Sequence, residues 1–512
     1  MPRYYAIFLI WVAIGGSIVA IFTTLPFGAG VSSDAVRILS TADNLLKGRG
    51  LYDYSGLPLL WWPPLYPLLL ASFTKVTGLD LFSIAWYLNI VLHGINIWLS
   101  GRWLYSIFQE RMIWAFLGVM LVATSLSMFK ASVSIGPDSL FIALSLAFLI
   151  VLGSWDGQSK KVLGFLAGLA AIAMLHRLLA IVLLATGSLF ILTKKNLRSK
   201  FVTASIFSIV SCLPLAAWLV LHNYLQYGTF FGPRSYEDML PWKNLISFLE
   251  KILNWFFPYF LLQNNFPFVG IGIFAILLIV FIATYRKANW TSLRNKYSRP
   301  EVWPGILFSL LYLATLIFTV DYFEHKYQSD DRFLVVILAP IIGMVFLAID
   351  KSILSRIQAN GKQIRLILII VFGIWSIYPT YFLYENVSHS YRAQGVVHNN
   401  IYNTPRYRNS ETIQMVNDLI EKSNAPITLY SNNPAAIWLF TRHDVRLLPM
   451  EPIKNHLAIT SELSSTSSKV YIVWLIPDEL EITVTPKRLA KIMTLETIFT
   501  SADGEIYSID NK

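Results

Sequence analysis

The sequence predicts a bundle of membrane-spanning helices that carries a small α/β domain at its C-terminal end. Of the 512 residues, 55% are hydrophobic and only 14% are charged, and the mean hydropathy is +0.55. A soluble chain of this composition could not cover its surface with polar groups. Apolar stretches of membrane length recur along the chain, and a less apolar C-terminal part follows them. These observations together indicate a mainly α-helical, polytopic integral membrane protein.

A helix that crosses the hydrocarbon core needs about 20 apolar residues, and about eleven segments come near this criterion. The expected spans are 5–25, 83–106, 112–130, 137–153, 162–175, 176–193, 201–221, 265–285, 302–320, 332–349 and 365–384. The segments 162–175 and 176–193 are short and could also be broken or steeply packed helices. The first span is too long and too aromatic for a cleaved signal, so we expect it to be retained.

Basic residues gather in alternate loops between the apolar segments. The clusters are Arg3; Arg102 with Arg111; Lys160-Lys161; Lys194-Lys195 with Arg198 and Lys200; Arg286-Lys287 with Arg294, Lys296 and Arg299; and Lys351, Arg356, Lys362 and Arg365. The positive-inside rule then predicts a cell (inner) membrane protein with its N-terminus in the cytoplasm and with loops 26–82 and 224–264 outside. No basic stripe with interleaved aromatic residues indicates a nucleic-acid partner.

Residues 386–512 are expected to form a separate extracytoplasmic α/β domain, beside a membrane domain of residues 1–385. The pattern predicts helices at 411–422 and 434–440 and strands at 427–430, 469–474 and 505–509. A unit of roughly 100 residues can bury its own core. The single cysteine, Cys212, lies in an apolar run, so no disulfide within the chain is expected.

The first external loop holds the strongest candidate for chemistry. Asp34 follows the first span, and Arg37 lies three residues later, where the two can share a helix face. A carboxylate close to hydrocarbon is costly and therefore suggests a functional site. Such a carboxylate could accept the proton of an attacking hydroxyl. The alternative is an ordinary ion pair on a surface helix.

The loop as a whole resembles a known family. Asp34-Ala35-Val36-Arg37, the segment Leu45-Leu46-Lys47-Gly48-Arg49-Gly50 and the run Trp62-Pro63-Pro64-Leu65-Tyr66-Pro67 are similar to the first external loop of GT-C glycosyltransferases. The similarity is to bacterial protein-mannosyltransferase-like and aminoarabinose-transferase-like enzymes. Ala35 occupies the place where many members have a second acidic residue, which favours Asp34 as a lone base over half of a metal-binding pair.

The resemblance continues at Gly136-Pro137-Asp138, which looks like the second acidic motif of the family and makes Asp138 a second catalytic candidate. A plain helix start is the alternative, because the helix dipole favours an acidic residue there. Arg177, next to His176 in an apolar stretch, could bind a phosphate or could reach the membrane interface. Asp330-Asp331-Arg332 resembles an acidic-Arg entry to a late helix, and a structural cap is its alternative.

The resemblance implies a GT-C helical bundle that transfers a monosaccharide from a polyprenyl-phosphate-linked donor to an extracytoplasmic lipid, glycan or protein acceptor. Asp34 would be the general base of an inverting displacement, with membrane lipid around the site. Arg37, Arg177 and Arg332 would bind the leaving phosphate. The residues expected around the substrate cavity are Asp43, Tyr66, His176, Asp330 and Asp331.

We expect no required metal or other cofactor, because Glu324 and His325 match no closed ligand set, although a divalent metal stays open. Phosphate-loop, dinucleotide and nucleophile-elbow motifs are missing from the sequence. Two other functions stay open. A transporter or flippase predicts ionisable residues at the bilayer midplane and two symmetric halves. A non-catalytic scaffold for envelope assembly would use the C-terminal domain as its binding module.

Overall fold

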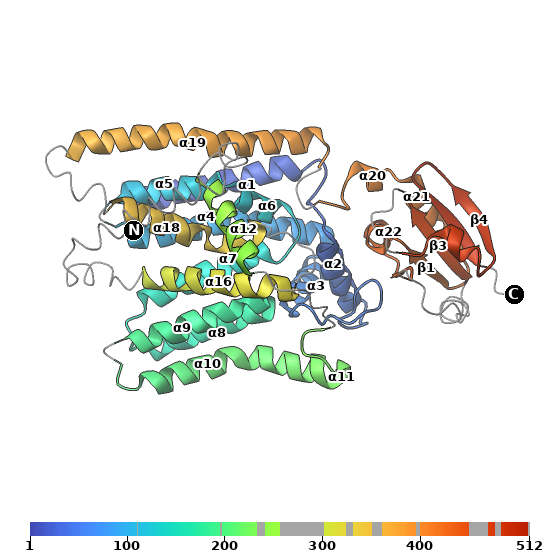
Figure 1. Cartoon of the computed structure of the whole chain (residues 1–512), viewed down its shortest axis with the longest axis horizontal. Coiled ribbons are helices and arrows are strands. Elements are labelled where there is room, and N and C mark those ends of the chain that lie inside the picture. The colour runs from blue at the N-terminus through green and yellow to red at the C-terminus, as the bar shows by residue number, and fades with distance from the viewer. Residues whose placement is uncertain are drawn as a thin grey trace.

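The computed structural model describes residues 1–109, 111–194, 197–232, 241–256, 302–323, 331–350, 361–395, 400–449, 469–476 and 483–509. Figure 1 shows long helices that lie roughly side by side, and an α/β domain at one end of them. Helices α2 and α3 occupy that same end, between the long helices and the α/β domain. We call it the tail end of the bundle. The predicted fold class, a helical bundle with a small α/β domain, is confirmed.

The long apolar helices form the body of the bundle. They are α1 (Arg3–Thr24), α4 (Leu81–Ile107), α5 (Met112–Ala123), α6 (Leu126–Val133), α7 (Asp138–Ser154), α8 (Lys160–His176), α9 (Ile181–Thr193), α10 (Lys200–Ala217), α16 (Trp303–Phe323), α18 (Leu338–Ile349) and α19 (Gly361–Arg392). Their buried apolar side chains form one large core cluster, with aromatic residues such as Trp103, Trp114 and Phe148 at its centre. Close van der Waals packing of these side chains holds the bundle together.

Among the described residues, four helical stretches are long and apolar enough to cross a membrane. They are Arg3–Thr24, Leu81–Ile107, Lys200–Tyr227 and Asp331–Ile349, and the bent pair α5 and α6 could make a fifth span. The segments 162–175 and 176–193 are two helices, because the backbone is extended at Arg177 between them. The expected span 265–285 lies outside the described residues, and the total of about eleven stays a prediction.

Shorter helices cover the tail end and its flank. They are α2 (Ser33–Leu46), α3 (Leu65–Thr77), the π-helix η2 (Trp218–Tyr224), α11 (Leu225–Tyr227), α12 (Pro241–Asn254) and α17 (Asp331–Leu334), with 3-10 turns η1 (Leu178–Ala180) and η3 (Val335–Ile337). Helix α2 is clearly amphipathic, and its buried face includes Val36 and Leu39. These short elements position the polar residues described below.

The C-terminal domain contains a five-stranded sheet of order β2-β1-β3-β5-β4. The strands are β1 (Ile427–Ser431), β2 (Val445–Leu447), β3 (Lys469–Leu475), β4 (Leu495–Thr500) and β5 (Gly504–Ile509), with helices α20 (Pro405–Arg408), α21 (Glu411–Lys422), α22 (Pro434–Thr441) and α24 (Pro486–Leu489). Strand β1 is parallel to β2 and β3, and β5 is antiparallel to β3 and β4. The predicted helices and strands are all present, while β2 and β4 were not predicted.

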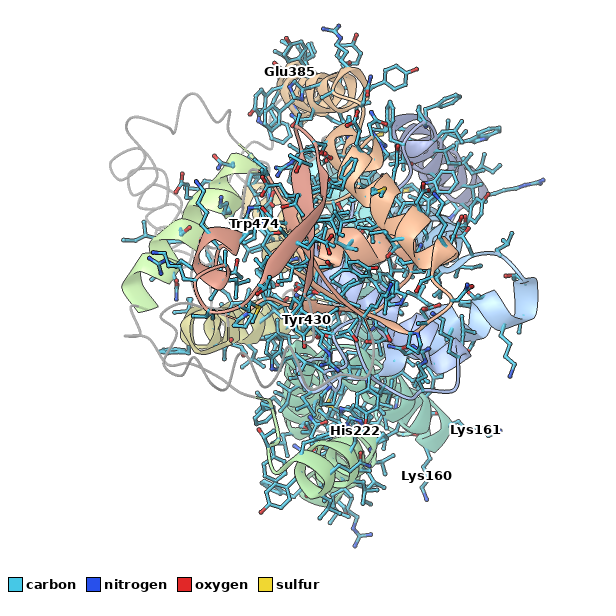
Figure 2. The ribbon with its side chains drawn as sticks, turned by 90° about the vertical axis from the view of Figure 1, so that its right-hand side faces the viewer. Lys160, Lys161, His222, Glu385, Tyr430 and Trp474 are labelled. Carbon is cyan, nitrogen blue, oxygen red and sulfur yellow. The ribbon has the colours of Figure 1, made fainter. Side chains whose placement is uncertain are left out.

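The C-terminal domain packs directly on the bundle. One apolar cluster contains Val36 and Leu39 of α2 together with Ile437 and Trp438 of α22. The ring of Tyr54 lies 6.5 Å from that of Trp438, centroid to centroid. In Figure 2, where this domain faces the viewer, Tyr430 on β1 and Trp474 on β3 lie in front of the helices. The two parts therefore share a hydrophobic core, although the boundary expected at residue 385 falls inside α19.

Candidate active site at the tail end

A cavity opens at the tail end of the bundle, and its atom-free space of about 710 Å³ includes open solvent. We call it the polar cavity, because several ionisable side chains line it. It is lined by residues from the five elements α2, α6, α7, α8 and α17 and from the loops beside them. The lining residues are Ser32, Asp34, Ile38, Trp62, Lys130, Ala131, Ser134, Ile135, Gly136, Pro137, Asp138, His176, Arg177, Arg332 and Phe333. Two carboxylates therefore face three cationic side chains, and this balance favours an anionic ligand.

Helix α2 presents Asp34 to the cavity. Ser32 caps the helix, since its hydroxyl accepts a hydrogen bond from the backbone N–H of Ala35 at 3.3 Å. Asp34 thus lies in the first turn, where the helix dipole favours a negative charge. Its side chain keeps 39% of its surface exposed, and Oδ2 lies 3.8 Å from Nη2 of Arg332. Asp34 is therefore an accessible carboxylate with a cationic neighbour.

Asp138 and Arg177 form a buried ion pair on the opposite wall. Asp138 is the first residue of α7, directly after Pro137, and Arg177 lies in the extended break after α8. Nη1 of Arg177 contacts Oδ1 of Asp138, and both side chains are nearly buried. The guanidinium also lies over the rings of Phe141 and Phe333, at 5.7 and 5.4 Å from their centroids. These contacts fix a positive charge in the wall of the cavity.

His176 completes this wall. Its Nε2 donates a hydrogen bond to the carbonyl oxygen of Pro137 at 2.6 Å, because a carbonyl can only accept. The ring of Tyr66 packs edge-on against His176, with centroids 5.6 Å apart. His176 therefore lines the cavity as predicted, whereas Tyr66 supports the imidazole from behind.

A second, larger cavity has about 1220 Å³ of atom-free space, part of which is open solvent, and shares a lining residue with the first. Its lining is mixed: α5, α18 and α19 contribute mainly apolar side chains, while α6, α17 and the amphipathic α12 contribute polar groups such as Ser127, Asp331 and Lys251. Among the described residues, Lys130 lines both cavities. Lys130 was not predicted from the sequence, where a single lysine on an eight-residue helix carries no motif.

Several predicted residues lie elsewhere. Arg37 does not line the polar cavity: its Nε lies 3.9 Å from Oδ2 of Asp53, and its guanidinium covers the Trp61 ring at 4.9 Å. The spacing of Asp34 and Arg37 suggested an ion pair, but Arg37 instead faces Asp53 and Asp34 faces Arg332. Asp43 also lies away from the cavity and binds Lys47 at 2.6 Å.

Asp53 is a buried acidic residue that was not among the residues predicted from the sequence. Its Oδ1 accepts hydrogen bonds from Ser55 N at 2.9 Å, Ser55 Oγ at 2.6 Å and Leu57 N at 3.1 Å. Hydrogen bonds of this kind, between a side chain and the residues that follow it, are typical of a turn and give Asp53 a structural role. Asp53 therefore orders the loop after α2 and holds Arg37 against it.

The acidic-Arg motif before the tenth expected span is only partly described. Arg332 lines the polar cavity, and Asp331 lines the larger one, where its Oδ2 accepts a hydrogen bond from Ser127 Oγ at 2.8 Å. Asp330 lies outside the described residues, as do Glu324 and His325. Within the described part of the chain, no three metal-ligating side chains come together. Metal dependence stays open to experiment.

A bundle that contains helices of membrane length, with a cavity lined by ionisable side chains at one end and an α/β domain beside it, has the architecture of a polytopic membrane protein. The structure is similar to ArnT from Cupriavidus metallidurans in the apo state, with a TM-score of 0.61, 12% identity and 98% of each chain covered. ArnT bound to undecaprenyl phosphate gives 0.57 at 12% identity, over 99% of this chain and 98% of that chain.

An oligosaccharyltransferase from Archaeoglobus fulgidus, tethered with an acceptor peptide, gives a TM-score of 0.53 at 10% identity, over 93% of this chain and 69% of that chain. These proteins are membrane glycosyltransferases of the GT-C superfamily. The chain therefore has the GT-C fold, as the resemblance predicted. No protein-family model and no curated protein sequence matches it.

Proposed function

We propose that this chain is a membrane glycosyltransferase that transfers a monosaccharide from a polyprenyl-phosphate-linked donor to an extracytoplasmic lipid, glycan or protein acceptor. The observation that carries the proposal is the pair of cavities at this end of the bundle that have Lys130 in both linings. A donor of this class has an apolar chain, an anionic phosphate and a polar sugar. Lys130, which lines both cavities, would bind the phosphate, and apolar side chains of the larger cavity such as Ile342 and Phe382 would contact the apolar chain.

The charges of the polar cavity suit the expected chemistry. When the glycosidic bond to the phosphate breaks, negative charge grows on the leaving polyprenyl phosphate. Lys130, Arg177 and Arg332 are the cationic groups that line the cavity and could stabilise that charge. Arg37 is no longer a good candidate for this role, because it lies on Trp61 beside Asp53.

Asp34 is the proposed general base. The acceptor oxygen attacks the anomeric carbon, its proton passes to Asp34, and the carbon–oxygen bond to the phosphate breaks with inversion of configuration. Asp34 is the more exposed acid of the cavity, while Asp138 is held by Arg177. Arg332 faces Asp34 at 3.8 Å, so a bound phosphate would compete with the carboxylate for this guanidinium. We therefore assign Asp138 to fixing Arg177 in place.

The distribution of charge supports an extracytoplasmic site. The basic residues Arg3, Arg111, Lys160 and Lys200 lie at or just before the starts of α1, α5, α8 and α10, which begin at the end of the bundle opposite the C-terminal domain (Figure 1). Basic residues at one end of the spans favour the cytoplasmic side for that end. The cavity and the C-terminal domain would then face outward. All ionised groups of the polar cavity lie at this one end, which favours an enzyme over a transporter with a midplane site.

Asp34→Asn tests the proposal in purified protein reconstituted into lipid. With an isotope-labelled polyprenyl-phosphate sugar, we expect wild-type protein to release polyprenyl phosphate and to transfer a matching amount of sugar. The variant should lose about 100- to 10,000-fold in turnover, since a general base contributes about that much. Asp156→Asn, an exposed acid in the loop between α7 and α8, is the matched control and should keep normal turnover.

Near-normal turnover of Asp34→Asn would exclude the base role. Movement of labelled donor across the membrane without release of polyprenyl phosphate would favour a flippase. If the protein neither transfers sugar nor moves the donor, and its C-terminal domain binds envelope components, the result would favour a scaffold.

A further inference from the structure

Three distant segments of the chain meet at Gly30, close to Ser32, Ser134 and Ile135 of the polar cavity lining. Gly30 N donates to Val133 O at 2.8 Å, and Ile135 N donates to Gly30 O at 2.8 Å. On the other side, the backbone N–H groups of Ile401 and Tyr402 both donate to Val31 O, at 3.0 and 3.1 Å. Residues 27–31, 133–135 and 400–403 thus lie side by side. We call this arrangement the three-segment junction.

Two buried asparagines bind the third segment to the first. Asn400 Oδ1 accepts hydrogen bonds from the backbone N–H groups of Val31 and Asn403, each at 3.0 Å. Asn403 Nδ2 donates to the carbonyl oxygens of Phe27 at 2.5 Å and Ala29 at 2.9 Å. Both asparagines are at least nine-tenths buried, so water does not compete for these bonds.

Two segments of the junction lie directly before the helices that carry the two acidic residues of the cavity, Asp34 and Asp138. Residues 27–31 precede Ser32, the cap of α2, and so position the first turn of this helix, which carries Asp34. Residues 133–135 run into Gly136-Pro137 and the first residue of α7, Asp138. The Gly30 bridge therefore ties together the backbones that carry Asp34 and Asp138, and the asparagines tie the C-terminal domain to the same bridge.

The space at Gly30 shows how closely the segments approach. A Cβ atom on Gly30 would lie 3.1 Å from Cβ of Asn400 and 3.1 Å from Oγ of Ser134. Both distances are shorter than ordinary van der Waals contact, so Asn400 and Ser134 would have to move by a few tenths of an ångström to make room for a methyl group. No hydrogen bond would be removed by that change.

We propose that Asn400 and Asn403 are positioning residues through which the C-terminal domain sets the placement of Asp34 against Asp138. The domain is then an integral part of the active site. The catalytic consequence rests on the proposed glycosyl transfer, whereas the structural consequence for α2 and α7 does not.

The test compares Gly30→Ala and Asn403→Ala with Gly15→Ala, a glycine of α1 whose added Cβ would meet nothing within 4 Å. Three quantities are measured in the full-length, reconstituted protein. They are kcat for sugar transfer, the affinity for polyprenyl phosphate in a direct titration, and hydrogen–deuterium exchange of peptides that cover α2 and α7.

We expect kcat to fall about tenfold in Gly30→Ala and by more in Asn403→Ala, because displacements near 1 Å can cost about 100-fold. Affinity for polyprenyl phosphate should change less than threefold, since the cationic groups stay in place. Amide exchange at the starts of α2 and α7 should rise together in both variants and stay unchanged in Gly15→Ala.

Wild-type kcat and exchange in Gly30→Ala would overturn the proposal, as would a loss of polyprenyl-phosphate affinity that parallels the loss of kcat. If Asn403→Ala does not fold, Gly30→Ala carries the test alone, because it removes no hydrogen bond. If the wild-type protein transfers no sugar, the proposed function fails, and amide exchange still decides the junction.

Discussion

At the scale of single residues, the ion pairs of the site are formed between segments that are distant in the sequence. Asp34 faces Arg332, and Asp138 binds Arg177. Arg37 shares a helix with Asp34, but stacking on Trp61 and attraction to Asp53 turn its side chain away. Spacing of three residues allows a pair on a helix face, and packing against an aromatic ring decides whether it forms.

Lys130 gives the first prediction at this scale. Lys130→Met keeps much of the side-chain volume and removes the positive charge of a residue that lines both cavities. We expect kcat/KM for the polyprenyl-phosphate donor to fall about 100-fold, because loss of one group that stabilises developing charge costs about that much. The measurement is steady-state transfer at varied donor concentration.

Lys161→Met is the control for Lys130→Met, since Lys161 is exposed at the start of α8 (Figure 2). It should retain wild-type kinetics. An equal loss in both variants, or none in Lys130→Met, would contradict the role of Lys130.

At the scale of elements, small residues let the helices of the bundle pack closely. Trp103 of α4 is 1% exposed, and its indole lies against Gly305 of α16 and Gly343 of α18. Added Cβ atoms would lie 2.4 Å from Cζ2 and 2.7 Å from Cζ3 of that ring, respectively. Membrane helices often associate through such small residues, because apolar side chains gain little by leaving lipid.

Gly305→Ala should therefore destabilise the bundle by about 1–3 kcal/mol, the usual cost of overpacking. The midpoint of thermal unfolding in detergent measures this change. Gly164→Ala on α8, where an added Cβ meets nothing within 4 Å, should leave the midpoint unchanged or raise it through better helix propensity. A stable Gly305→Ala would show that α4 and α16 can separate without loss.

At the scale of the whole molecule, the C-terminal domain contacts the bundle in two places. It shares an apolar cluster with α2, and the three-segment junction connects it to the segments that precede Asp34 and Asp138. Its internal contacts include a polar group around Asp503, whose Oδ1 accepts a hydrogen bond from Thr412 Oγ1 at 2.9 Å. Burial would raise the pKa of Asp503, but hydrogen bonds from Ser410, Ser501 and Thr412 outweigh it and hold the pKa below its usual value.

This depressed pKa predicts how stability depends on pH. The contribution of Asp503 is complete above its unfolded-state pKa, near 4, and is lost as pH falls through the lower folded-state pKa. Asp503→Asn should therefore lower the unfolding midpoint of the full chain at pH 7, and the gap to wild type should close as the pH falls below 4. Glu421→Gln, an exposed acid on α21, should show neither effect. A gap that is constant with pH would contradict the assignment.

The local patterns of the sequence predicted the helical bundle and most of the C-terminal elements, from apolar runs and from alternation in segments such as Lys469–Leu475. The short strand Val445–Leu447 and the exposed strand Leu495–Thr500 were missed because neither buries a full alternating face. Asp34, Asp138, Arg177, Arg332 and His176 were identified from the sequence and do line one cavity. Their catalytic roles stay predictions.

By itself, the sequence determined the membrane character of this chain, the order of its elements and the acids near its surface, because hydropathy and periodicity are local properties of a chain. Only the tertiary structure decided which charges pair, that Lys130 lines two cavities and that Asn400 and Asn403 reach the segment before Asp34. A cavity and a three-segment junction arise where distant segments pack together. The free energy of that packing depends on the shape of all the partners at once.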